Sequence, residues 1–291
     1  MIDKSLLVIG AEKKGPSTKK IIEEGEKLFK EVYFAPVKEI TLKLGEKEIE
    51  IKHKTKDLTK FDYCLPRIDS KRAQHGYHII RAMDIMGMKK PYPAETIHIA
   101  HNKFTTLEVL QKVGIPVPET YLVGSEDVAK DVFKKTGFPL VIKIVDSFGG
   151  QGVILVENQS SAFSVISTLN FMKQQIIIQE FVENPGEDTR AYIIDGEIIA
   201  SYKRIASKDE FRSNLFSGGR AEYTTITGEM AEVALKAATV VKSDIIAIDM
   251  LTSEEGPKVI EVNLNPGLKG IQPFKNVAKI IVDFIAEKVG E

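Results

Sequence analysis

Two acidic residues near the end of the chain, Asp249 and Glu261, lie in short apolar runs where a buried strand should carry no charge. The two runs can pair as a hairpin, and if Leu251 faces Val259, the two carboxylates lie directly opposite each other. Facing carboxylates among apolar neighbours repel each other and lose hydration, and a divalent cation such as Mg²⁺ would offset both effects. The pattern therefore indicates either a cation site or an edge hairpin with a solvated polar face.

A lysine and a glycine-rich turn suggest a place for phosphate. Lys143 is the one charge in the strand-like run 140–145, and Gly149, Gly150 and Gly152 follow it closely. A buried lysine needs an anion, and glycines let backbone N–H groups approach phosphate oxygens. The alternatives are an edge-strand lysine and an ordinary hairpin loop.

The apolar run 176–182 is interrupted by Gln179 and Glu180. Backbone groups of Glu180, Phe181 and Val182 could pair with an adenine edge, and Asp188 could accept hydrogen bonds from ribose hydroxyls. The alternative is a strand end that returns to solvent.

Two further loops can be considered as phosphate-binding sites. The polar loop 206–220 carries Arg212 and Asn214, which could clamp a γ-phosphate and supply a neutral oxygen ligand. The segment 10–17 has the outer spacing of a Walker A loop, but Pro16 replaces its essential lysine. We therefore exclude a Walker A site there.

Composition describes a globular protein without a strong field. The chain has 291 residues and a net charge of −1, so no long-range potential favours nucleic acid or membrane partners. A single cysteine, Cys64, agrees with a reducing compartment, and no leader or spanning segment is visible. We expect a cytoplasmic protein. The excess of Lys over Arg favours a thermophile or an AT-rich genome.

The order of expected elements predicts α/β followed by α+β architecture. Strands and helices alternate in an N-terminal parallel-sheet domain (1–95) that also contains a hairpin at 41–51. A helical connector (96–120) leads to a central α+β unit (121–183). Strands paired as hairpins, including one on Asp195-Gly196, predict an antiparallel sheet in the last unit (184–291).

Several motifs in order carry a family resemblance. They are Asp-Thr-Arg at 188–190, Phe-Arg-Ser-Asn-Leu at 211–215, Gly218-Gly219, and Glu-Val-Asn-Leu-Asn-Pro-Gly-Leu at 261–268. The chain resembles RimK-type ATP-grasp carboxylate–amine ligases, which add glutamate to protein or coenzyme acceptors. The resemblance implies an ATP-grasp fold with an N-terminal pre-ATP-grasp domain, a central lid and a C-terminal subdomain with the metal site.

The resemblance also implies roles for residues of this chain. Phosphate contacts would come from Lys103, Lys143 and the glycine loop, with Lys203 as a further nucleotide contact. Adenine and ribose would contact Glu180–Val182 and Asp188, and Arg212 and Asn214 would lie at the γ-phosphate. Two Mg²⁺ or Mn²⁺ ions would bind the set Asp249, Glu261 and Asn263. Arg204 would act in catalysis, and the substrate would contact Arg67, Arg190, Gly218 and Gly219.

The implied reaction forms an acyl phosphate from ATP and an acceptor carboxylate, and an amino group then displaces phosphate. The motif continuation at 265–268 favours L-glutamate as the added amino acid. The acceptor would be a protein C-terminus or an archaeal coenzyme such as tetrahydromethanopterin or F420. A carrier-protein ligase of lysine or arginine biosynthesis, a small-molecule kinase and a nucleotide-binding regulator remain open. Analogy predicts a homodimer or tetramer.

Overall fold

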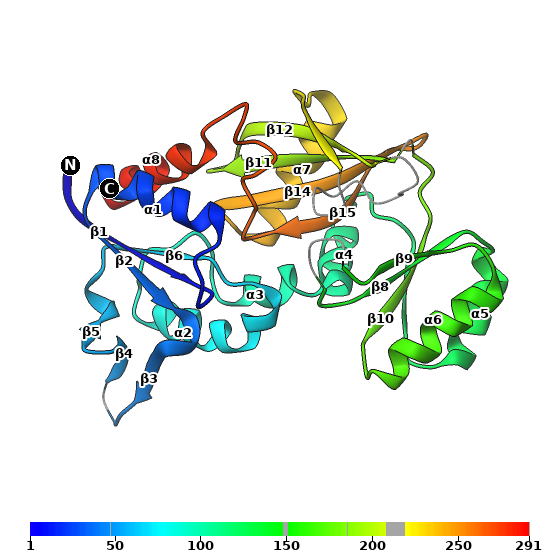
Figure 1. Ribbon diagram of the computed structural model, residues 1–291, viewed down its shortest axis with the longest axis horizontal. Helices are drawn as coiled ribbons and strands as arrows, with labels where there is room; N and C mark the ends of the chain where they lie inside the picture. Colours follow the sequence, from blue (N-terminus) through cyan, green and yellow to red (C-terminus); the bar gives the residue numbers. More distant parts are fainter. Residues whose placement is uncertain (47, 148–150, 185, 208–218, 291) are drawn as a thin grey trace.

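The computed structural model describes residues 1–46, 48–147, 151–184, 186–207 and 219–290. The chain opens with three parallel strands in the spatial order β2-β1-β6, and helices follow β1 and β6 (Figure 1). The elements are β1 (Ile2–Gly10), α1 (Pro16–Leu28), β2 (Phe29–Pro36), β6 (Tyr63–Pro66) and α2 (Ala73–Ile85). The predicted parallel-sheet domain is confirmed.

Strand β1 lies at the centre of this sheet because its residues 6–9 are apolar without alternation, which suits burial on both faces. Helix α1 begins where Pro16 takes a first-turn position, at which its missing N–H costs nothing. A small antiparallel sheet extends from the same region, as predicted for 41–51. It consists of β3 (Ile40–Leu44), β4 (Ile49–His53) and the short β5 (Lys56–Asp57).

Single-turn 3₁₀ segments and two helices complete this half. The 3₁₀ segments are Val37–Glu39, Leu58–Lys60 and Ser70–Arg72, and the helices of the connector are α3 (Glu95–Ala100) and α4 (Lys103–Lys112). Helix α4 starts at Lys103 because the side chain of Asn102 caps it, accepting from the Thr105 N–H at 3.0 Å. The cap fixes Lys103 in the first turn of the helix.

The central unit is a four-stranded antiparallel sheet, ordered β7-β10-β8-β9, with two helices on it (green in Figure 1). Its elements are β7 (Thr120–Val123), α5 (Glu126–Thr136), β8 (Leu140–Ile144), β9 (Val153–Val156), α6 (Gln159–Phe171) and β10 (Ile176–Glu180). The apolar side chains of the sheet and of both helices form one cluster drawn only from residues 121–178. We call residues 120–180 the lid.

The last unit is a five-stranded antiparallel sheet in the order β13-β12-β11-β14-β15. Its elements are β11 (Glu187–Ile194), β12 (Glu197–Ile205), β13 (Arg220–Tyr223), α7 (Gly228–Val241), β14 (Ile245–Ser253), β15 (Gly256–Asn263) and α8 (Val277–Gly290). The predicted turn at Asp195-Gly196 is confirmed: both residues have positive φ, 52° and 74°, as a tight two-residue hairpin requires.

The N-terminal and C-terminal units share their hydrophobic cores. One cluster joins Leu7 and Ile9 of β1 to Ile246 and Ile248 of β14, and a second joins Leu6 and Val8 to residues of α8. Helices α1 and α8 accordingly lie side by side in Figure 1, near both chain ends. The two units form one packed body, to which the lid is attached.

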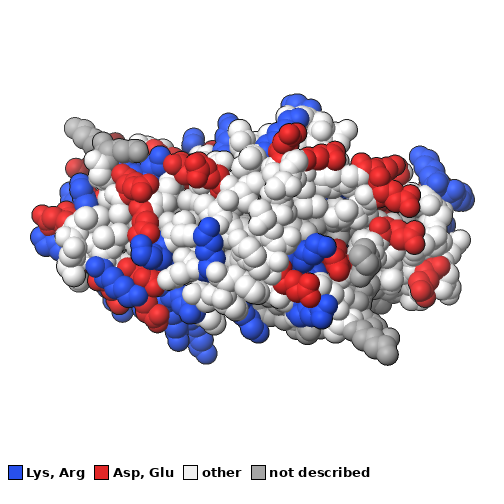
Figure 2. Space-filling view, turned by 90° about the horizontal axis from the view of Figure 1, so that it is seen from above, with Lys and Arg blue, Asp and Glu red and all other residues white. Residues whose placement is uncertain are grey.

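The surface carries both signs of charge. On the face shown in Figure 2, Lys and Arg side chains are interspersed with Asp and Glu side chains around a largely uncharged central area. Among the described residues, no helix combines the length and apolarity needed to cross a bilayer.

Candidate active site

The predicted pairing of the two acidic residues is confirmed, with one irregularity. Asp249 on β14 pairs with Glu261 on β15, but the next pair joins Met250 to Val259, so Ile260 is an extra residue in β15. The expected facing of Leu251 and Val259 is therefore wrong, and Leu251 pairs with Lys258. A β-bulge of this kind bends the strand and redirects side chains, and bulges are frequent beside active sites.

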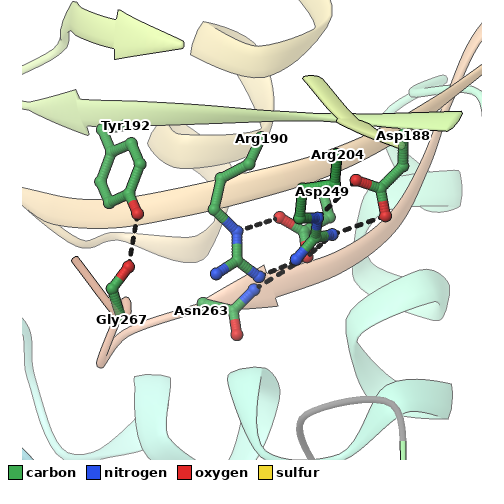
Figure 3. A network of polar contacts seen from close by, with 7 residues as sticks. All are labelled: Asp188, Arg190, Tyr192, Arg204, Asp249, Asn263 and Gly267. Carbon is green, nitrogen blue, oxygen red and sulfur yellow. Dashed lines mark hydrogen bonds and ion pairs between the residues drawn. The ribbon is translucent and has the colours of Figure 1, made fainter. Parts of the chain in front are cut away.

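Asp249 lies at the centre of a buried ion-pair network (Figure 3). Its side chain has no exposed surface. Arg190 donates to it through Nε and Nη2, both at 2.6 Å, and Arg204 Nη2 donates at 2.7 Å. Asn263 Nδ2 lies 3.4 Å from Asp249 Oδ2, the oxygen that Arg204 also contacts. Two guanidinium groups thus neutralise the carboxylate for which the sequence predicted a metal.

The second carboxylate of this network is Asp188. It is paired with Arg204 on the adjacent strand β12 and accepts from its Nε and Nη2 at 2.5 and 2.6 Å. Arg204 therefore bridges Asp188 and Asp249. The predicted ribose contact of Asp188 stays a prediction, and it requires this carboxylate to bind the ribose hydroxyls while it also holds Arg204.

The network shifts the proton equilibria of its members. Burial alone would raise the pKa of Asp249, but the charges and hydrogen bonds of Arg190 and Arg204 outweigh burial and hold that pKa below its usual value. The same contacts raise the pKa of both arginines against the effect of burial. All three groups are therefore charged at neutral pH.

Two lysines come together on the lid side of this sheet. Lys143, on β8, is almost wholly buried, and its Nζ donates to Gln179 Oε1 at 2.5 Å. Lys103 donates to the Ser147 carbonyl and to Ser147 Oγ, the latter at 3.2 Å. Gln179 interrupts an apolar strand, so the sequence offered a signal for its contact with Lys143. No sequence pattern indicated the contact of Lys103 with Ser147.

Burial disfavours the charge on both lysines. It lowers the pKa of Lys143 to about 8 and also lowers the pKa of Lys103, while the nearby Glu261 carboxylate opposes both shifts. An anion bound beside either lysine would therefore stabilise its charged form. Phosphate oxygens have the required charge, and this is the observation that fits nucleotide to the site.

The glycine loop is described only in part. Gly152 has φ +66°, and a Cβ there would lie 2.8 Å from Ile144 Cδ1, so glycine is required at this position. Its carbonyl accepts from the Ile144 N–H at 2.9 Å. Gly149, Gly150, Arg212, Asn214 and Gly218 lie outside the described residues. Gly219 directly precedes β13.

The predicted adenine segment lies where the lid meets the C-terminal sheet. Glu180 ends β10 and forms an ion pair with Lys258 of β15 at 2.9 Å. Its backbone N–H donates to Glu119, and the Val182 carbonyl accepts from Asn184 Nδ2. Phe181 is partly buried between these two positions. The contact of Lys258 was not predicted from the sequence.

Two predicted residues lie apart from this network. Lys203 neighbours Arg204 in sequence, so its side chain is on the opposite face of β12, where it pairs with Glu187 at 3.0 Å. Arg67 follows β6 in the N-terminal unit and donates to the Pro266 carbonyl at 3.1 Å. Arg67 is thereby tied to the loop that follows the metal-ligand candidates.

The residues predicted to bind metal are brought onto one face, but they do not form a cluster of acids. Within the described ranges, no group of three or more His, Cys, Asp or Glu side chains is arranged to hold a metal ion. The Asp249 oxygens accept from guanidinium groups, whereas Glu261 forms no ion pair with another described residue. Glu261 and Asn263 are therefore the ligands most available to a cation.

Comparison with known proteins agrees with this architecture. Residues 5–97 match the RimK pre-ATP-grasp domain, and residues 100–285 match the RimK-like ATP-grasp domain. The chain belongs to the RimK-like ATP-grasp family. It is an enzyme of the ATP-dependent carboxylate–amine ligase class.

Relatives of this RimK-like protein cover nearly all of it. A probable alpha-L-glutamate ligase of Methanococcoides burtonii is 35% identical over 279 residues, which cover 94% of this chain and 92% of the relative. One from Aliivibrio fischeri (strain MJ11) with the same description is 34% identical over 273 residues, covering 92% and 91%.

Solved structures share the fold at low identity. The ATP-grasp ligase PsnB, complexed with minimal precursor, Mg and ADP, has a TM-score of 0.75 at 17% identity, with all of both chains covered. D-alanine–D-alanine ligase from Bacillus anthracis has a TM-score of 0.72 at 19% identity, covering 99% of this chain and 97% of that one. These similarities establish the ATP-grasp fold.

Proposed function

We propose that this protein joins L-glutamate to an acceptor carboxylate and converts ATP to ADP and phosphate. The observation that carries the proposal is the pair of lysines formed by the partly buried Lys103 of α4 and the buried Lys143 of β8, since both lie near the Glu261 carboxylate of the Asp249–Glu261 pair. Glutamate is proposed because relatives at 34–35% identity are described as probable alpha-L-glutamate ligases.

The nucleotide would lie between the lid and the C-terminal sheet. Its phosphates would contact Lys103, Lys143 and the loop that ends at Gly152, and its adenine would contact the segment Glu180–Val182. Asp188 is proposed for the ribose, whereas Lys203, on the opposite face of β12, is not assigned a ribose contact. Arg212 and Asn214 remain proposed contacts of the γ-phosphate.

Mg²⁺ or Mn²⁺ would be held by Glu261 and Asn263, and by Asp249 if Arg190 shares that carboxylate. Bound there, two such ions would supply positive charge that offsets the negative charge developing on the phosphates during the transfer. The solved structure of the ATP-grasp ligase PsnB, which shares this fold, contains Mg and ADP, and this supports Mg²⁺ as the metal.

The chain's own residues would order the reaction. An acceptor carboxylate oxygen attacks the γ-phosphorus, the bond to the bridging β–γ oxygen breaks, and ADP leaves. The amino nitrogen then attacks the acyl carbon, phosphate leaves, and the nitrogen loses a proton as the amide forms. Arg190 and Arg204, fixed by Asp188 and Asp249, present rigid guanidinium groups that would hold the substrate carboxylate and the acyl phosphate.

The acceptor is a protein or peptide C-terminus, or a coenzyme of the tetrahydromethanopterin or F420 type. Neither nucleic acid nor membrane is proposed as a partner, and a homo-oligomer is expected by analogy with ATP-grasp ligases.

The test is product analysis by mass spectrometry. The protein is incubated with ATP, Mg²⁺, L-glutamate and a panel of acceptors, and a mass increase of one or more glutamyl residues should accompany ADP and phosphate release. Glu261→Gln should abolish both. Release of ADP with a stable phosphorylated product and no glutamyl adduct would show a kinase instead.

A further inference from the structure

A cavity of about 220 Å³ lies in the N-terminal unit, at the carboxyl ends of its parallel strands. Residues after β1, on β2 and after β6 line it, among them Ala11, Phe34 and Arg67. In the order β2-β1-β6, the chain leaves β1 toward β2 on one side and returns to β6 on the other. Ligands of open α/β sheets bind at such a switch point, outside the carboxyl ends of the strands.

The cavity is lined by cations. Lys13 and Lys14 belong to the loop after β1, and the Lys14 ammonium lies 5.0 Å from the centre of the Phe34 ring. The first turn of α1 also lines it, and no side chain caps that end of the 13-residue helix. Backbone N–H groups and the helix dipole favour an anion there.

Arg67 is the second, independent sign of an anion. It is only 5% exposed, it lines the cavity, and its Nε has no hydrogen-bond partner among the residues that the structure describes. Among the described residues, no carboxylate forms an ion pair with it. Burial lowers the pKa of Arg67 to about 10. A buried guanidinium without a counter-ion is costly, so a bound anion would relieve that cost.

Two hydrogen-bond acceptors on the same cavity also lack partners within the described part of the chain. They are Oδ1 of Asp69 and Oδ1 of Asn265, both buried. The other oxygen of Asp69 accepts from Arg72 Nη1 at 2.6 Å, and Glu12 pairs with Arg72 and, at 4.0 Å, with Lys38, so two cations balance the two acids at the rim. The cavity thus combines unpaired cations with unpaired acceptors.

Its position links it to the proposed reaction. Asn265 lies two residues beyond Asn263, the last residue of β15, and Arg67 donates to the carbonyl of Pro266, the residue after Asn265. A substrate in contact with Asn265 would therefore lie near Asn263 and the network around Asp249.

We infer that this cavity binds the carboxylate of a substrate that carries an N–H donor beside it, with Arg67, Lys13, Lys14 and the α1 N-terminus holding the carboxylate and Asp69 and Asn265 accepting from the N–H. This inference rests on the proposed function and names a subsite for it. Two substrates share the chemistry: an acceptor that ends in an amide-linked amino acid, and free L-glutamate.

Binding without turnover tests the subsite. Calorimetry on the full chain with saturating ADP and Mg²⁺ would use N-acetyl-L-glutamate as the amide-linked probe and L-glutamate as the free one. Lys13→Ala/Lys14→Ala removes two exposed lysines, and Lys19→Ala/Lys20→Ala removes the same charge from the exposed side of α1, away from the cavity. We expect about a tenfold or greater rise in Kd for the first pair only, the effect of lost charge-assisted hydrogen bonds.

The probe whose Kd rises identifies the substrate. Dependence of N-acetyl-L-glutamate on Lys13 and Lys14 assigns the subsite to the acceptor, and dependence of L-glutamate alone assigns it to the incoming amino acid. Equal Kd values in both lysine pairs, for both probes, would overturn the inference. Calorimetry with ADP measures binding alone, and product analysis measures the ligase reaction separately. If binding depends on Lys13 and Lys14 but no glutamyl product forms with ATP, the proposed function is refuted and the subsite is retained.

Discussion

Asp249 and Arg190 form a two-pronged ion pair, with both guanidinium contacts at 2.6 Å, between adjacent strands β14 and β11. The pair occupies the buried position at which the sequence predicted a metal ligand. Asp249 therefore fixes the arginines of the site whether or not it also contacts a cation.

Replacing Asp249 should lower the stability of the folded protein, in addition to any effect on activity. Asp249→Asn leaves two buried guanidinium groups, those of Arg190 and Arg204, with one carboxylate less, and removing one partner of a buried pair costs about 3–5 kcal/mol. Urea unfolding measures this loss. The matched change Glu261→Gln, at a partly exposed residue without an ion pair among the described residues, should alter the free energy of unfolding by less than about 1 kcal/mol while abolishing glutamyl transfer.

Much of this region was predictable because it depends on local patterns. The expected hairpin placed Glu261 opposite Asp249, although its closing pair was wrong, and the Asp195-Gly196 signal placed the neighbouring hairpin. The bulge at Ile260 was missed: the adjacent apolar residues Val259 and Ile260 interrupt the alternation, but the same interruption fits the start of an alternating run. The arginine clamp was missed because it depends on the register between β11 and β14, strands separated by more than fifty residues.

The short strands show the same limit. β5 and β13 contain two and four residues of mostly polar character, and they are strands only because a neighbour supplies hydrogen-bond partners. The cavity proposed to bind a carboxylate was likewise missed: the loop at 10–17 was considered only as a Walker A motif and set aside, and only the fold brings Arg67 and Asn265 to it.

Nucleotide affinity should fall as pH rises above about 8. Burial lowers the pKa of Lys143 to about 8, so the free protein loses this charge above that pH, and bound phosphate must then restore it. Calorimetric Kd values for ADP with Mg²⁺ at pH 7, 8 and 9 should rise by up to tenfold per unit at the upper end. Lys143→Met should bind more weakly at every pH and show a flatter profile.

The same shift has the opposite sign for stability. Between pH 8 and the ordinary value of 10.5, the unfolded chain holds the Lys143 proton and the folded chain does not. The free energy of unfolding contributed by this lysine therefore rises with pH across that window in the absence of nucleotide. A decrease there in the difference between wild type and Lys143→Met would contradict the assignment.

Gln179 should set the midpoint of this profile. Its Oε1 accepts from Lys143 Nζ at 2.5 Å, so Gln179→Glu places a negative charge beside the ammonium and should raise the Lys143 pKa above 8. The pH at which ADP affinity falls should move upward. Thr120→Val is the matched control: it removes the hydroxyl that accepts from Gln179 Nε2 at 2.8 Å and should leave the midpoint unchanged.

Two glycines with the same backbone conformation separate strain from steric contact. Gly152 and Gly87 have φ of +66° and +68°, but a Cβ would lie 2.8 Å from Ile144 Cδ1 only at Gly152. Gly87→Ala should cost about 1 kcal/mol in unfolding free energy, and Gly152→Ala should cost about 1–3 kcal/mol more. Equal losses in thermal unfolding would show that Ile144 can move aside.

The separate core of the lid determines which measurements should detect a substitution within it. Among the described residues, those of 120–180 share no apolar cluster with the other units, and the links between them include a partly exposed ion pair, Glu180–Lys258, and the Lys103–Ser147 contact. We therefore expect the lid to open as a unit at a free energy below that of global unfolding. Substitutions inside it, such as at Phe133 or Ile166, should register first as weakened nucleotide binding and faster amide hydrogen exchange, while the melting of the larger body stays unchanged.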